Sequence, residues 1–174
     1  LEGSLRIRQN KNPSIRYLNL AKVNDPYSFL NVMEYVFGGN SENIALVAYF
    51  RKDRAGRTKL FEDIFPEIMQ RMKGRIRHIW LSGYATTHVL SHMPPELQKI
   101  TEVADAGDIE KILSSVKSDN LVLVTMVNSV NPFMIELRNR LEEGGALHQF
   151  PVPEKIPVTA GNPSGNPGDS EMSG

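Results

Sequence analysis

The sequence predicts an α/β fold: a three-layer, Rossmann-like domain with a mostly parallel sheet of about five strands. From Ser14 onward, short β-rich runs alternate with amphipathic stretches, and turn or capping residues mark each change. The run IALVAYF (44–50) is almost continuously apolar, as expected for a parallel strand covered by helices on both faces. Strands that alternate with helices pair in parallel through right-handed crossovers, which gives the three layers.

The order of the elements follows from these boundaries. A helix begins at Asp25 and Pro26, because a carboxylate caps free N–H groups and proline fits the first turn, and it ends near Phe37 before two glycines. Pro66 predicts a kink or a break in the second helix, and Asp108 or a neighbour caps the fourth. Strands are expected at 15–23, 44–50, 76–81, 99–103 and 121–127, and helices at 26–37, 59–72, 84–93, 106–117 and 132–145.

Length and composition indicate one domain with two tails. The chain has 174 residues and 40% apolar content, enough for one substantial core. Residues 14–145 form the predicted domain. The opening LEGS resembles a tag remnant, so residues 1–13 are expected to be a tag remnant or linker, and the segment 146–174 is a proline- and glycine-rich tail expected to be disordered.

Composition also excludes several function classes. Twenty Lys and Arg balance twenty Asp and Glu, so the chain lacks the general positive field of a nucleic-acid binder, and no nucleic-acid partner is expected. Without cysteine there is no thiol catalysis and no disulfide. No apolar run approaches the roughly 18 residues that cross a bilayer. No GxxxxGK[ST], GxGxxG or GxSxG motif is present.

The charged stretch FRKDRAGRT directly follows the second predicted strand. Ligands of open α/β sheets bind at the carboxyl ends of the strands, so these cations suit a substrate carboxylate or phosphate, with Asp53 holding one arginine in place. A solvated turn with exposed charges explains the same residues equally well. The substrate-binding candidates are Arg51, Asp53, Arg54, Arg57 and Thr58, and Thr58 or a neighbour begins the next helix.

The first strand-to-helix turn supplies the nucleotide-binding candidates Asn24, Asp25 and Pro26. Their polar groups can hydrogen-bond the hydroxyls or base of a nucleotide beside a helix N-terminus. The alternative is that Asp25 is only a helix cap, and the spacing alone favours it because capping is common.

His88 and His92 are four residues apart on a predicted helix, a spacing compatible with a metal. No glutamate follows His88 directly and no third ligand is evident in the sequence. The sequence therefore predicts no metal site. His78 and His148 have no evident partner.

Three stretches resemble one family. The first is Asn24-Asp25-Pro26 with Ser28. The second is the pattern R-x-D-R-x-x-R-T with a following phenylalanine, matched by Arg51, Asp53, Arg54, Arg57, Thr58 and Phe61. The third is a strand-Gly-x-Thr-Thr pattern, matched with a gap by Leu81, Gly83, Thr86 and Thr87. Over residues 15–145 the chain resembles the C-terminal domain of the ATP-dependent ligase component of poly-γ-glutamate synthase, a relative of the Mur peptide ligases and folylpolyglutamate synthetase.

The resemblance implies the mobile third domain of an amide ligase, which phosphorylates a carboxylate with ATP before an amino group attacks the acyl phosphate. A central domain, in the same or another chain, would bind most of the ATP and Mg²⁺, so this chain would be inactive alone. Asn24 and Asp25 would face the nucleotide and the arginines the substrate. Further cleft candidates are Gly83, Thr86, Thr87 and Asn128. The expected location is cytoplasmic, at the inner face of the membrane beside membrane-embedded synthase subunits, with self-association left open.

Two other functions stay open. The family has a glycine-rich loop after its last strand, whereas the segment 127–132 contains no glycine. The absence of glycine from this segment favours a non-catalytic α/β interaction module. A stand-alone nucleotide- or phosphometabolite-binding protein is the third possibility.

Overall fold

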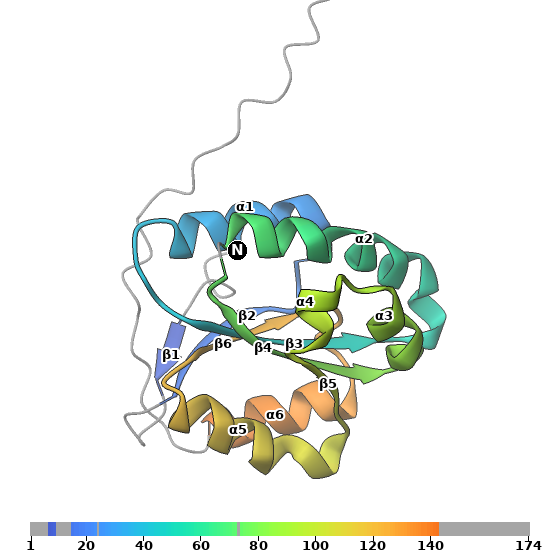
Figure 1. The fold of residues 1–174 in the computed structure, drawn as a ribbon. Coiled ribbons are helices and arrows are strands. Elements are labelled where there is room, and N and C mark those ends of the chain that lie inside the picture. The colour runs from blue at the N-terminus through green and yellow to red at the C-terminus, as the bar shows by residue number, and fades with distance from the viewer. Residues whose placement is uncertain (1–6, 10–14, 24, 73, 143–174) are drawn as a thin grey trace, which may run out of the picture.

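The computed structural model describes residues 7–9, 15–23, 25–72 and 74–142. One six-stranded sheet has the order β1-β2-β6-β3-β4-β5 (Figure 1). All neighbouring strands are parallel except β1 and β2, which pair antiparallel at one edge. The strands are β1 (Ile7–Gln9), β2 (Arg16–Leu20), β3 (Ile44–Phe50), β4 (Ile76–Gly83), β5 (Thr101–Val103) and β6 (Val122–Met126). The predicted α/β fold with a mostly parallel sheet is confirmed.

The helices form two layers around this sheet. Figure 1 shows α1 to α4 on one face and α5 with α6 on the other. The helices are α1 (Pro26–Phe37), α2 (Ala55–Arg71), α3 (Thr86–His92), α4 (Pro95–Gln98), α5 (Ile109–Ser118) and α6 (Pro132–Glu142), with 3-10 turns η1 (Lys52–Arg54) and η2 (Ala106–Asp108). None of the helices in the described ranges is long and apolar enough to cross a membrane.

Two apolar cores hold the layers together, and β3 contributes to both. Leu46 and Ala48 point into the core shared with α1 and α2, whereas Ala45 and Val47 point into the core shared with α5 and α6. All four side chains are fully buried. This explains the continuous apolar run, because a strand covered on both faces has no solvent side on which polar residues are tolerated.

The structure differs from the predicted elements at several points. The strand β1 was not expected, and it lies within the segment assigned to a tag remnant or linker. The helix α2 runs without a break through Pro66, although the ring nitrogen cannot donate to the preceding turn. Before α5 the predicted capping by Asp108 or a neighbour is confirmed as a reciprocal pair, in which the Asp105 side chain accepts from Gly107 N and the Asp108 side chain accepts from Asp105 N. The predicted tail 146–174 lies outside the described residues.

Gly83 ends β4 at a point where no other residue fits well. Its φ is +91°, in the left-handed region, and an added Cβ would lie 2.2 Å from the carbonyl oxygen of Phe50. That carbonyl also accepts a hydrogen bond from Tyr84 N at 2.8 Å. Backbone of β3 therefore packs against Gly83 so closely that a side chain would displace the end of the central strand.

Gly83→Ala should lower the free energy of unfolding by about 2–4 kcal/mol, since it combines left-handed strain with a backbone clash. Gly56→Ala is the matched control, because Gly56 lies near the start of α2 with no atom within 4 Å of an added Cβ. The control should raise stability by up to about 1 kcal/mol. Urea denaturation of both variants measures the difference, and equal midpoints would contradict the close approach at Gly83.

Candidate functional site

The carboxyl ends of β2, β6 and β3 meet at one edge of the sheet. The register aligns Leu20 and Ala48 with Met126, so the three following loops start side by side. The helices after β2 and β3 cover one face of the sheet and the helix after β6 covers the other (Figure 1). Such a reversal opens a crevice in α/β sheets. An open hollow of about 400 Å³ lies there, lined by Ala21, Lys22, Arg51, Arg54, Arg57, Asn128, Ser129 and Val130.

Asp53 fixes one of the three arginines. The Nε of Arg51 donates to Oδ1 of Asp53 at 2.8 Å, and its Nη2 donates to Oδ2 at 2.5 Å. This bidentate bond, in which the carboxylate accepts from a cation, holds the pKa of Asp53 below its usual value and raises the pKa of Arg51. Asp53 does not itself line the hollow. It orients Arg51 there, the role that the sequence analysis gave it.

Asn128 fixes the second arginine and joins three elements. Its Oδ1 accepts from Nη1 of Arg57 at 3.2 Å, and its Nδ2 donates to the carbonyl oxygen of Tyr49 at 3.0 Å. Asn131 donates from Nδ2 to the Asn128 carbonyl at 2.7 Å and accepts from Met134 N through Oδ1, at the start of α6. These hydrogen bonds link β3, α2 and the loop before α6 around the hollow.

The loop after β6 has left-handed backbone at two successive residues that are not glycine. Val127 has φ +61° and Asn128 has φ +43°. A β-branched residue is an outlier in this region, and each such residue costs on the order of 1–3 kcal/mol. This loop contains no glycine. The loop nevertheless takes a backbone conformation typical of glycine. The hydrogen bonds of the Asn128 side chain to Arg57 and to the Tyr49 carbonyl hold it there.

Two cations of the hollow are available to a ligand. Lys22 and Arg54 are exposed, and their side chains make no hydrogen bond or ion pair with the described part of the chain. Because Asp53 compensates Arg51 and no carboxylate lines the hollow, Lys22, Arg54 and Arg57 leave it positively charged. Forked guanidinium groups suit carboxylate or phosphate oxygens. The arrangement can therefore hold an anionic ligand at the ends of the strands.

Two of the nucleotide-binding candidates, Asp25 and Pro26, lie at the start of α1 and are not among the residues that line this hollow. Asp25 is the N-cap: Oδ2 accepts from Ser28 Oγ at 2.5 Å and from Ser28 N at 2.9 Å, and Oδ1 accepts from Tyr27 N at 3.3 Å. The bond from the Ser28 hydroxyl is the main cause that lowers the pKa of Asp25. Pro26 is buried as the first residue of α1, and Asn24 lies outside the described residues.

The remaining candidates are dispersed. Thr58 is buried in α2, and within the described ranges its Oγ1 has no hydrogen-bond partner. Thr86 is buried at the start of α3, whereas Thr87 is exposed. Gly83 lines a second hollow of about 470 Å³ beyond β4 and β5, beside Asp105 and Asp108. The sequence candidates that share the first hollow are Arg51, Arg54, Arg57 and Asn128.

Sequence reasoning missed Lys22, Ser129 and Val130, which also line the first hollow. Each follows the last residue of β2 or β6 within four positions. Their position just after a strand was therefore the signal that the sequence offered. The order of the strands in the sheet, β2-β6-β3, was needed to show that the loops after them lie together.

Asn128→Ala should lower the free energy of unfolding by about 1–3 kcal/mol, because it leaves the Tyr49 carbonyl unpaired and keeps a left-handed φ without the side-chain hydrogen bonds. Asn139→Ala, on the exposed side of α6, should change stability by less than about 0.5 kcal/mol. Thermal unfolding monitored by circular dichroism compares the two. A harmless Asn128→Ala would mean that the loop does not depend on these bonds.

Asp25→Ala should cost about 1 kcal/mol through loss of the helix cap, and Asp25→Asn should cost less because asparagine also caps. The lowered pKa sets the pH dependence: the carboxylate contributes its stability above the unfolded value near 3.8 and loses it as pH falls through the lower folded value. Denaturation midpoints of wild type and Asp25→Asn between pH 7 and pH 2 test this. Their difference should shrink at the acid end, and a constant difference would contradict it.

Comparison with protein families gives one match that spans the whole described fold. Residues 4–144 match the family described as Poly-gamma-glutamate synthase CapB C-terminal domain. The matched segment includes all six strands and all the helices, from β1 to α6. No curated protein matches the chain significantly.

Proposed function

Because the chain belongs to the poly-gamma-glutamate synthase CapB C-terminal domain family, we propose that it is the closing domain of an ATP-dependent amide ligase. In this proposal it closes over nucleotide and substrate carboxylate while the acyl phosphate forms. The observation that carries the proposal is the cationic hollow where β2, β6 and β3 end. A domain that closes on anionic groups requires such cations on the surface that it presents.

The cations of the hollow take two roles. Arg54 and Lys22 have no protein partner among the described residues, so they bind the carboxylate or phosphate oxygens of the substrate side. Arg51 and Arg57 are held by Asp53 and Asn128, and so present their remaining N–H groups in fixed directions. Closure also excludes water, which would otherwise hydrolyse an acyl phosphate.

The residues at the start of α1 fit a nucleotide as a secondary contact. Each carboxylate oxygen of Asp25 has two lone pairs, so the capping bonds leave acceptor capacity for a ribose hydroxyl. Asp25 is exposed, which makes that capacity accessible. ATP and Mg²⁺ supply the phosphoryl group and its charge neutralisation, and a central ligase domain of the same or another chain holds most of both.

The proposed partners are inferred from membership of the family and not from a surface of this chain. Besides the central domain, they are membrane-embedded synthase subunits at the cytoplasmic face of the membrane. By this proposal the chain does not ligate alone. Binding of ATP or ADP to the isolated chain, measured by calorimetry, should be weak, and tight binding would favour a stand-alone nucleotide-binding protein.

The deciding experiment adds the 174-residue chain to the central ligase domain of a poly-γ-glutamate synthase and measures ATP turnover with glutamate or a glutamate polymer. Arg54→Ala should lower kcat/KM by at least about tenfold with the melting temperature unchanged, because the Arg54 side chain is exposed and makes no hydrogen bond or ion pair with the described residues. Arg77→Ala is the control, since Arg77 is exposed near the amino end of β4 and bonds Asn43.

Two outcomes would sink the proposal. One is no ATP turnover with a correctly folded chain, which would favour the interaction module. The other is turnover that Arg54→Ala and Arg77→Ala leave equally unchanged, because the hollow would then have no part in the reaction.

A further inference from the structure

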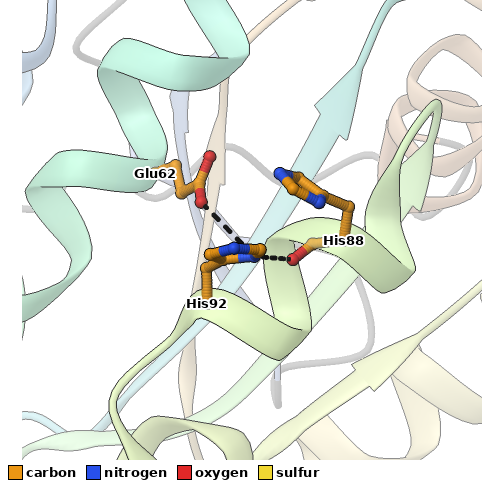
Figure 2. Close-up of side chains that lie close together, drawn as sticks. All are labelled: Glu62, His88 and His92. Atoms are coloured by element: carbon orange, nitrogen blue, oxygen red, sulfur yellow. Dashed lines mark hydrogen bonds and ion pairs between the residues drawn. The ribbon is translucent and has the colours of Figure 1, made fainter.

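Three potential metal ligands come together between α2 and α3, and they line neither hollow described above. Figure 2 shows Glu62 of α2 facing His88 and His92 of α3. One ligand atom from each side chain lies within 4.8 Å of the other two. The two histidines could be identified from the sequence, but the third ligand could not, because Glu62 lies 26 positions before His88 along the chain.

Helix geometry brings the two histidines together. Residues four apart lie on the same face of a helix, and the ring centroids of His88 and His92 are 4.2 Å apart. Both side chains are exposed, so both rings can rotate toward a common ion. Among ion ligands in proteins, imidazole pairs at this spacing suit zinc and its neighbours in the first transition row.

The burial of the Glu62 side chain is stronger evidence for a cation site than the spacing of the histidines, because that side chain is only 8% exposed. Within the described residues its carboxylate accepts no hydrogen bond. The nearest side-chain nitrogen atoms, Lys59 Nζ and His92 Nδ1, are both 3.9 Å away, and Lys59 is engaged by Asp63 at 2.9 Å. A carboxylate withdrawn from water to this extent is costly unless a cation compensates it. The histidine face of α3 is where such a cation would lie.

The hydrogen bonding of His92 also suits coordination. Its Nδ1 lies 2.8 Å from the carbonyl oxygen of His88 (Figure 2). A proton on Nδ1 would be donated to that carbonyl, which leaves Nε2 with a free lone pair. Because Nδ1 is the nitrogen that lies 3.9 Å from Glu62, the exposed ring must turn to bring Nε2 toward that carboxylate. Metal-binding histidines in proteins are oriented in this way by a backbone carbonyl on the second nitrogen.

We propose that Glu62, His88 and His92 bind a divalent transition-metal ion, with zinc the best fit. Two imidazoles and one carboxylate are a zinc donor set that leaves the fourth tetrahedral position to water or an external ligand. With bonds of about 2.0–2.2 Å, tetrahedral ligands lie roughly 3.3 Å apart, so the ligand atoms, which now lie within 4.8 Å of one another, must approach by at most about 1.5 Å. Mg²⁺ and Ca²⁺ fit less well because they prefer oxygen ligands throughout.

The bound ion would connect α2 to α3. The same α2 carries Arg57 one and a half turns before Glu62, so the ion would also stabilise the helix that presents an arginine to the hollow. This role depends on the metal site alone, and it holds whether or not the proposed ligase function is correct.

The test uses the full 174-residue chain, freed of metal with a chelator and titrated with zinc chloride. Calorimetry should give a stoichiometry of one ion per chain. The melting temperature should rise by several degrees in saturating zinc. Glu62→Gln and His92→Gln should each weaken zinc affinity by at least about tenfold. Both substitutions keep side-chain size, and the metal-free melting temperatures check that the variants fold.

Two matched controls distinguish zinc binding at this cluster from nonspecific zinc binding elsewhere on the chain. Glu67→Gln removes another carboxylate of α2, which pairs with Arg71, and it should leave the affinity unchanged. His78→Gln removes a histidine of β4 that stacks on Trp80 away from this cluster, and it should also leave the affinity unchanged.

Three results would overturn the proposal. They are no saturable zinc binding to the wild type, zinc binding without a rise in melting temperature, and unchanged affinity in Glu62→Gln. The last would show a two-histidine surface chelate that does not involve the buried carboxylate. A tenfold loss in Glu62→Gln and His92→Gln with neither control affected supports the three-ligand site.

Discussion

Burial of β3 on both faces is the constraint from which the rest of the arrangement follows. Leu46 and Ala48 pack under α1 and α2 while Ala45 and Val47 pack over α5 and α6, so the strand must lie at the centre of the sheet. Parallel neighbours on both sides then bring every following loop to one edge. The charged stretch after Phe50 lies at that edge, where its cations meet loops from elsewhere in the chain.

The loops around the hollow at this edge are held together by hydrogen bonds between polar groups. Asn128 bonds Arg57 and the Tyr49 carbonyl, and Asp53 bonds Arg51. Two left-handed residues, Val127 and Asn128, are part of the same loop. Strain of this kind persists where the surrounding structure fixes it, and it concentrates at functional sites. The loop therefore supports a site in the hollow even though it contains no glycine, which weakens the main argument for an interaction module that has lost its chemistry.

The hollow and the cluster of Glu62, His88 and His92 share one element. The first turns of α2 carry Arg57, and the next turn carries Glu62, which faces α3. A cation at the cluster would compensate a buried carboxylate and restrain the same helix from its other side. The two features use different chemistry, since the hollow is short of negative charge and the cluster is short of positive charge. One helix thus places an anion-binding and a cation-binding surface about one and a half turns apart.

The sequence by itself determined the α/β class, the parallel strands and the approximate positions of most elements, because periodicity, capping residues and apolar runs are local. The helix at Pro26–Phe37 and the strand at Ile44–Phe50 were predicted at their observed bounds for that reason. It also located the arginine cluster after a buried strand. The sequence did not reveal β1, whose three residues carry too little pattern, or the sheet order, which depends on which strands pack side by side. Tertiary structure alone decided that Arg57 meets Asn128, 71 positions away, and that Glu62 completes a set with two histidines. Such partners are chosen by packing across the sheet and between helices, and spacing along the chain carries no record of them.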